Sequence, residues 1–101
     1  MTTNVATIKQ TNSAVLTNSS VSVAVTATQI VGADSTRLGL LLVNVSDTTM
    51  YLGGTLVTVA TGFALLANST VYMDEEEAVV AWFGIHGGSG TKDLRVLAVT
   101  T

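Results

Sequence analysis

The single histidine, His86, is the side chain best suited to general acid–base catalysis near neutral pH. A general base needs a positioned proton partner and usually a third group that orients it. Asp93 is the nearest acidic residue that follows, and nothing in its spacing assigns it to either role. No acid–base or nucleophile set can be assembled around His86, so we expect a loop residue there and a protein that is not an enzyme.

The segment around His86, residues 84–92, reads G-I-H-G-G-S-G-T-K and superficially resembles a phosphate-binding loop. It lacks the G-x-x-x-x-G-K-[ST] spacing, and a strand-like run follows it where a phosphate loop would open a helix. The glycines are better explained by a flexible hairpin connection. The segment therefore predicts no nucleotide site, and we expect no cofactor.

Four acidic residues, 74–77, could attract a hard cation such as calcium. They lack the alternating ligand spacing of calcium loops, so we expect a solvated acidic loop and no metal site. Tyr51, Tyr72 and Trp82 are too few and too far apart for a base-stacking platform. A sugar-binding aromatic patch remains an alternative that no motif supports.

Charge and composition narrow the choice of partner. The 101 residues carry a net charge of −3 and only four basic residues, all scattered, which argues against nucleic-acid binding. No run of about 18 apolar residues is present, so we expect no membrane-spanning segment. Cysteine is absent, which excludes a disulfide framework and a thiolate site within these residues.

Charged residues make up 11% of the chain, against about 25% in an ordinary soluble domain. A monomer of this composition would expose a large neutral surface. One interpretation is a weakly charged β-domain that is simply soluble enough. The other, which we favour, is that copies of the same chain or a partner cover much of this surface.

Short runs of Val, Leu, Ile and Thr, separated by Gly, Asn, Asp and Ser, predict strands throughout. We expect an all-β fold, a single antiparallel jelly-roll-like β-sandwich of about eight short strands over residues 14–101. Residues 1–13 predict an extended N-terminal arm, with a frayed terminus as the alternative. A helix is conceivable only around residues 74–83, where acidic residues precede an apolar run.

Two predicted strands, 37–45 and 78–85, are apolar on both faces, whereas an outer strand of a solitary sandwich alternates apolar and polar residues. Either loops cover the second face, or that face is a subunit interface. We favour the interface. The side chains expected on it are Leu41, Val43, Val80 and Trp82.

From Arg37 onward the pattern is more particular. Arg37 opens a strand that ends at Asn44, a polar turn follows, and residues 50–53 read Met-Tyr-Leu-Gly. Further on come Gly-Phe-Ala-Leu at 62–65, an Asn-Ser turn and Val-Val-Ala-Trp at 79–82, and Arg-Val-Leu at 95–97 closes the chain. This succession resembles small β-rich structural proteins of tailed bacteriophages.

That resemblance implies a virion structural protein, namely a capsid decoration or cement protein on the outer surface of the phage head. Its partners would be itself, as a homotrimer, and the major capsid protein, after assembly in the host cytoplasm. The arm, with Val5 and Ile8, would contact the shell. The alternatives are a tail, neck or fibre component of the virion and, from another class, a small carbohydrate- or receptor-binding module.

Overall fold

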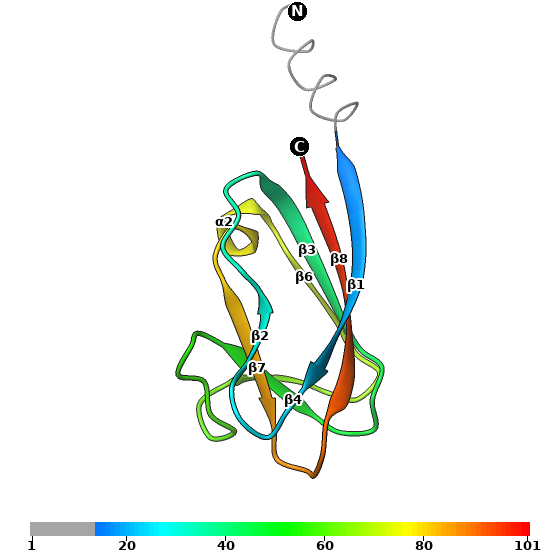
Figure 1. The fold of residues 1–101 in the computed structure, drawn as a ribbon, viewed down its shortest axis with the longest axis vertical. Coiled ribbons are helices and arrows are strands. Elements are labelled where there is room, and N and C mark those ends of the chain that lie inside the picture. The colour runs from blue at the N-terminus through cyan, green and yellow to red at the C-terminus, as the bar shows by residue number, and fades with distance from the viewer. Residues whose placement is uncertain (1–13) are drawn as a thin grey trace, which may run out of the picture.

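The computed structural model describes residues 14–101, which form eight strands and one short helix (Figure 1). The elements in chain order are β1 (Val15–Val23), β2 (Thr28–Val31), β3 (Arg37–Asn44), β4 (Met50–Gly53), β5 (Phe63–Leu65), β6 (Thr70–Met73), α2 (Glu75–Ala78), β7 (Trp82–His86) and β8 (Lys92–Thr100). The predicted arm, with Val5 and Ile8, lies outside the described residues. No helix in the described part of the chain is long and apolar enough to cross a membrane.

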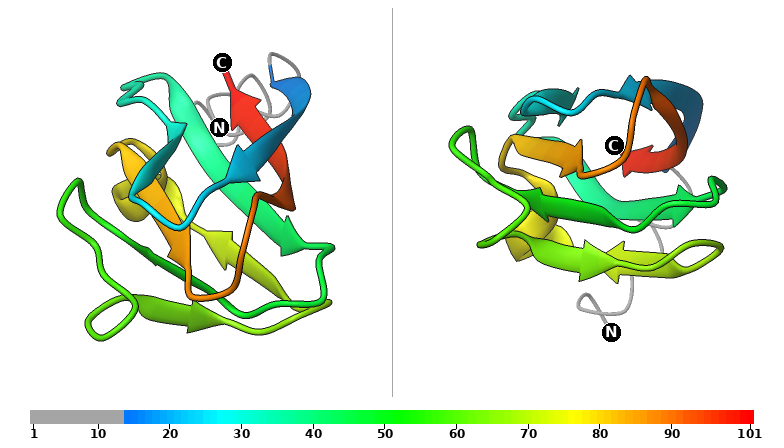
Figure 2. Two further views of the ribbon diagram at one scale, coloured as in Figure 1. Left: turned by 60° about the horizontal axis from the view of Figure 1, so that its bottom comes forward. Right: turned by 90° about the horizontal axis from the view of Figure 1, so that it is seen from below.

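The strands form two four-stranded antiparallel sheets packed face to face (Figure 2). Sheet A has the order β1-β8-β3-β6, and sheet B has the order β2-β7-β4-β5. Most consecutive strands alternate between the sheets, which is the wrapping of a jelly roll. The predicted all-β sandwich of about eight strands is therefore confirmed.

The core lies between the sheets and is built mainly from alternate residues of the longer strands. Leu40 and Leu42 of β3 are fully buried, as the alternation predicts. They pack with Leu94 of β8 and with Met50 and Leu52 of β4, all at most 1% exposed.

A β-bulge at the start of β3 changes the direction of one charged side chain. The register against β8 shifts between Arg37 and Gly39, so Arg37 is directed into the sandwich and is only 6% exposed. Its guanidinium donates hydrogen bonds to the carbonyl oxygens of Ala78, at 2.5 Å, and Gly32, at 2.9 Å. Arg37 thus connects β3 to the end of α2 and to the segment after β2.

The predicted strand 78–85 is wrong in its first half. Residues 75–78 form the single-turn helix α2, a turn follows, and β7 begins only at Trp82. Three glutamates in the first turn favour a helix N-terminus, and Ala78 packs its small side chain fully buried. The helical alternative for residues 74–83 is correct for residues 75–78 only, and the strand prediction holds from Trp82.

Strand β1 begins at Val15, six residues before the clean alternation that starts at Val21. Its first residues are polar and exposed, and they predict a strand poorly. They are extended because they pair with β8, and the pairing continues without a break from Val15 to Val23.

Candidate interaction surfaces

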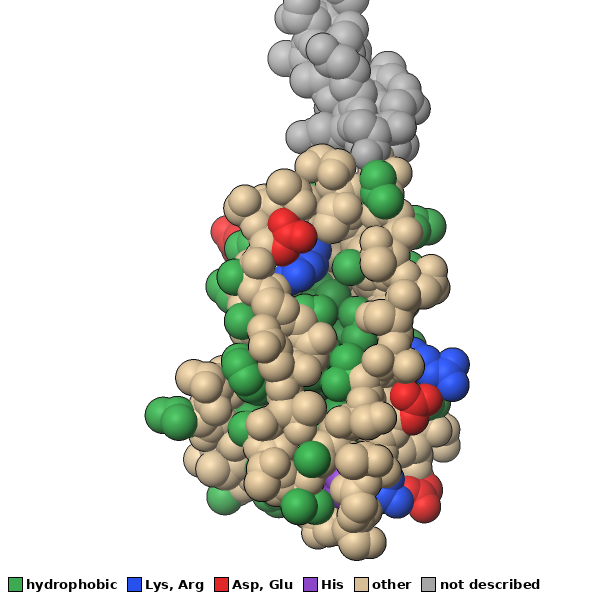
Figure 3. Space-filling model, in the orientation of Figure 1, with side chains coloured by type: hydrophobic (Ala, Val, Ile, Leu, Met, Phe, Trp, Pro, Cys, Tyr) green, Lys and Arg blue, Asp and Glu red, His purple; other side chains and the backbone are tan. Residues whose placement is uncertain are grey.

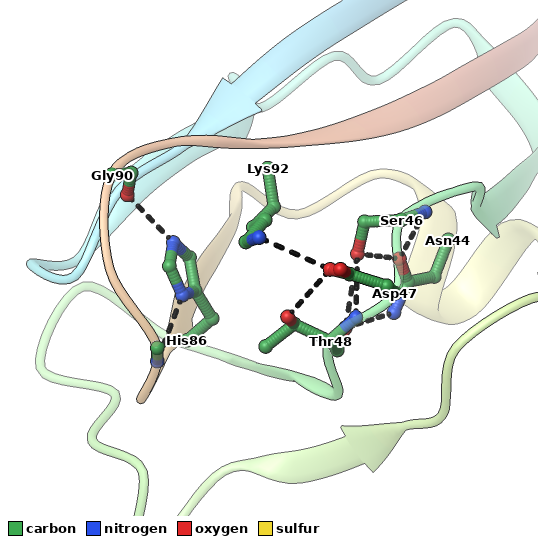
Figure 4. Close-up of polar contacts among 8 residues, drawn as sticks. Asn44, Ser46, Asp47, Thr48, His86, Gly90 and Lys92 are labelled. Carbon is green, nitrogen blue, oxygen red and sulfur yellow. Dashed lines mark hydrogen bonds and ion pairs between the residues drawn. The ribbon is translucent and has the colours of Figure 1, made fainter.

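His86 is the last residue of β7 and is fully buried. Its Nδ1 accepts a hydrogen bond from the Gly88 N–H at 3.1 Å. The Nε2 therefore carries the N–H of the ring and donates a hydrogen bond to the Gly90 carbonyl oxygen at 2.9 Å. Both ring nitrogens are thus engaged by the loop that follows β7 (Figure 4). The ring positions that loop and has no nitrogen free for a substrate.

A second polar cluster, on the turn between β3 and β4, lies near this loop (Figure 4). The buried Asn44 amide donates to the carbonyls of Thr48, at 2.8 Å, and Leu65, at 2.9 Å, and its Oδ1 accepts from the Ser46 N–H and hydroxyl. Every polar atom of this side chain is satisfied within the fold. The cluster shapes the turn and joins it to β5.

Lys92 and Asp47 connect the turn to the first residue of β8 through an ion pair of 3.0 Å between Nζ and Oδ1. Hydrogen bonds from Lys92 and then Thr48 hold the pKa of the Asp47 carboxyl below its usual value. A hydrogen bond from the Thr36 hydroxyl likewise lowers the pKa of Asp34. Within residues 14–101, no three His, Cys, Asp or Glu side chains are grouped so that they could hold a metal ion. The carboxylates of Asp34 and Asp47 are instead hydrogen-bonded to residues of their own turns and to Lys92.

Among residues 14–101, no loop covers the outer face of sheet A. Pairing places Leu41 of β3 opposite Leu97 of β8 and opposite Tyr72 of β6, so the three lie in one row across the sheet. Leu16 of β1 pairs with Val99 at one side of this row. Leu16 is 64% exposed and Tyr72 is 59% exposed, whereas Leu41, Val43, Leu97 and Val99 are half-buried. We call these six residues the bare face.

Gly39 lies directly beside the Tyr72 side chain on the bare face. A Cβ at Gly39 would lie 2.6 Å from the Tyr72 hydroxyl oxygen and 3.2 Å from its ring carbons. The Tyr72 ring therefore lies flat across the backbone of Gly39, where a larger residue would push it away. This arrangement widens the apolar surface without adding a further side chain.

Sheet B is covered on its outer face by the loop 54–62. A Cβ at Gly53 would meet Val57, and one at Gly62 would meet both Tyr51 and Val57. Val57 is 8% exposed, and Ile85, which pairs with Tyr51 on this face, is 9% exposed. The loop is stabilised by hydrogen bonds between Thr58 and Thr61. The burial of Ile85 on the outer face of β7 is thus explained within one chain.

The four predicted interface residues in the described region divide between different surroundings. Leu41 and Val43 lie on the bare face. Trp82 pairs with Val31 and packs against the core, and its indole N–H donates to the Glu77 carbonyl at 2.8 Å. Val80 is 48% exposed in the turn before β7. Trp82 thus lies on the inward face of β7 and is partly buried, and its part in an interface stays a prediction.

Alternation alone does not reveal which outer face is covered. Tyr72 and Leu97 were not among the interface residues predicted from the sequence, although both lie on the outer face of their strands. The Asn44–Ser46 spacing is a signal that could have found the polar turn, because an Asn side chain often bonds the backbone two residues on.

Comparisons with known proteins show no family. No family model matches the chain, and no curated protein matches it. A solved chain from Bacillus endospore appendages, described as disulfide-linked pili, has a TM-score of 0.49 and 12% identity, over 87% of this chain and 88% of that chain.

This finding corrects the phage interpretation. The match is to a bacterial appendage and not to a phage head, so the expected decoration protein, its capsid partner and its virion location are wrong. Among the alternatives, a fibre component comes closer in kind, but the matched fibre is a pilus. The predicted trimer stays a prediction.

Proposed function

We propose that the chain is a non-enzymatic structural subunit that associates with copies of itself through the bare face of sheet A. The contrast between the two outer faces carries this proposal. Both sheets present apolar residues outward, but within residues 14–101 a covering loop lies over sheet B alone. Exposed apolar patches of this kind are typical of association sites.

The surroundings of the bare face support self-association over a charged partner. Two charged residues lie on the same outer face, Arg95 opposite Val43 and Asp93 two residues before it, and they pair with each other at 2.8 Å. Figure 3 views the opening between the two sheets, where hydrophobic groups show between β2 and the β1–β8 pair. An apolar surface whose charges are already paired with each other fits best against another surface of the same kind, and a second copy supplies one.

Repetition of such contacts would build a polymer, and the matched Bacillus endospore appendages are described as pili. Those pili are described as disulfide-linked, whereas these 101 residues contain no cysteine. A polymer of this chain would rest on many weak non-covalent contacts that gain strength through multivalency.

Sedimentation velocity over a range of protein concentrations tests the proposal. Tyr72→Asp places a charge at the bare face, and we expect it to shift the protein toward monomer. Phe63→Asp is the matched control, because Phe63 is also an aromatic residue with 59% exposure and lies on sheet B. A wild-type protein that stays monomeric at high concentration, or equal behaviour of the two variants, would refute the proposal.

A further inference from the structure

Strand β1 forms the longest free edge of the sandwich. It pairs on one side with β8, and no strand within residues 14–101 pairs with its other side. Six of its nine residues are exposed from Val15 onward without interruption. Its backbone therefore presents a row of hydrogen-bonding groups that another strand could complete.

The other three edges are protected in ways that β1 is not. Strands β5 and β6 have only three and four residues, and β2 has four with a register shift. Natural edge strands avoid pairing by being short or bulged, or by carrying charge or proline. The nine residues of β1, VLTNSSVSV, have no charge, no proline and no bulge. The unprotected edge is thus confined to one strand.

We infer that β1 pairs with β1 of a second copy, antiparallel about a two-fold axis. Length selects this partner, because no other free edge in the described residues matches nine residues. Nothing in the sequence of β1 disfavours this pairing, because none of its nine residues is charged. The inference deepens the proposed self-association by naming a second contact and its symmetry, and it rests on that proposal.

Full overlap of the two strands centres the pair on Ser19. Val15 then lies opposite Val23 of the second copy, and Thr17 lies opposite Val21. These partners have the same parity along the strand, so inward and outward faces are preserved across the junction. Valine and threonine pairs are among those that stabilise adjacent strands.

The resulting sheet would have eight strands, with the two bare faces on the same side. On the side of the bare faces, Leu16 would lie opposite Ser22 of the second copy and Asn18 opposite Ser20, so a polar strip would separate the two apolar surfaces. This edge contact is isologous and closes as a dimer, so growth beyond two copies would need the bare face. A trimer cannot be built from this edge contact alone.

Cysteine crosslinking tests the inference directly, because the chain has no thiol of its own. Opposed residues in antiparallel strands lie about 4.5–5.5 Å apart between Cα atoms, which suits a disulfide. Ser19→Cys should therefore form a disulfide-linked dimer on mild oxidation, much faster than Ser89→Cys in the exposed loop after β7. Equal rates for the two variants would overturn the inference.

A mixture of Ser19→Cys and Val71→Cys proteins tests a pairing of β1 with β6, because Ser19 and Val71 lie on the same face of sheet A. If the mixed dimer forms in preference to the Ser19 homodimer, β1 pairs with β6 and the two-fold inference is wrong. Ser19→Lys adds an independent measurement, because it places like charges opposite each other at an exposed position. We expect it to raise the dimer dissociation constant by at least about tenfold, and an unchanged constant would count against the pairing.

The bare-face contact and the β1 edge contact can be refuted independently of each other. Ser19→Cys crosslinking that persists in a Tyr72→Asp background supports the edge contact whatever the fate of the bare face. Loss of crosslinking only in that background would show that the edge does not pair by itself, which contradicts an independent β1 contact.

Discussion

The outer faces of the two sheets differ in what lies on them. Sheet B carries the loop 54–62, with Val57 inserted over β4; on this face Ile85 is buried and Tyr51 is half-buried. Sheet A carries nothing among the described residues, and Tyr72 and Leu16 remain more than half exposed. Apolar residues on both faces of a strand therefore have two explanations in one small domain: a covering loop on one side and, as we propose, a second copy on the other.

The largest difference should come from placing a charge on each face. Val57→Asp buries a carboxylate under the loop and should lower the free energy of unfolding by about 3 kcal/mol or more. Val43→Asp, on the bare face, should cost about 1 kcal/mol or less in the monomer and should impair association instead. Urea denaturation at low protein concentration measures both. Equal losses of stability would contradict the claim that one outer face is covered and the other is not.

Two glycines give a smaller, matched comparison. Gly62→Ala would place a Cβ 2.6 Å from the Tyr51 Cβ and 2.8 Å from a Val57 methyl, which the packed loop accommodates poorly. We expect a loss of about 1–3 kcal/mol. At Gly39 the obstacle is the end of the exposed Tyr72 side chain, which can rotate away, so Gly39→Ala should cost less than Gly62→Ala. Thermal unfolding of the two variants provides the check, and the reverse order would contradict the account.

The Asp47–Lys92 pair lies at one end of the sandwich and should affect neither face. Because folding lowers the pKa of Asp47, the pair stabilises the fold above the carboxyl's unfolded pKa, about 3.9, and this contribution is lost as pH falls through the folded pKa. Asp47→Asn should therefore cause a small loss of stability at neutral pH that disappears in acid. Denaturation at several pH values measures it. A change in association at neutral pH would show that this end also contacts a partner.

The sequence predicted the sandwich and the inward alternation of Leu40 and Leu42, because these follow from periodicity along single strands. Three features depend on residues far apart in the chain and were not predictable in this way. The bulge that buries Arg37 needs the register of β8, and the early start of β1 needs the template of β8. The cover over sheet B needs the loop 54–62 to fold back on β4.

The candidate surface was predicted only in part. Leu41 and Val43 were chosen from the two-faced pattern of their strand and do lie on the bare face, whereas Trp82 was chosen on the same grounds and packs inward. The pattern reports that a second face is apolar. Whether a loop of the same chain covers it depends on tertiary structure.

Hydroxyl-radical footprinting of Tyr72 and Phe63 tests the central claim most directly, because both aromatic side chains are 59% exposed in the single chain. The modification of each would be compared between dilute, dissociated protein and concentrated, assembled protein. The account predicts that Tyr72 becomes protected on assembly while Phe63 stays reactive. Protection of Phe63 without Tyr72, or assembly that leaves Tyr72 as reactive as before, would contradict it.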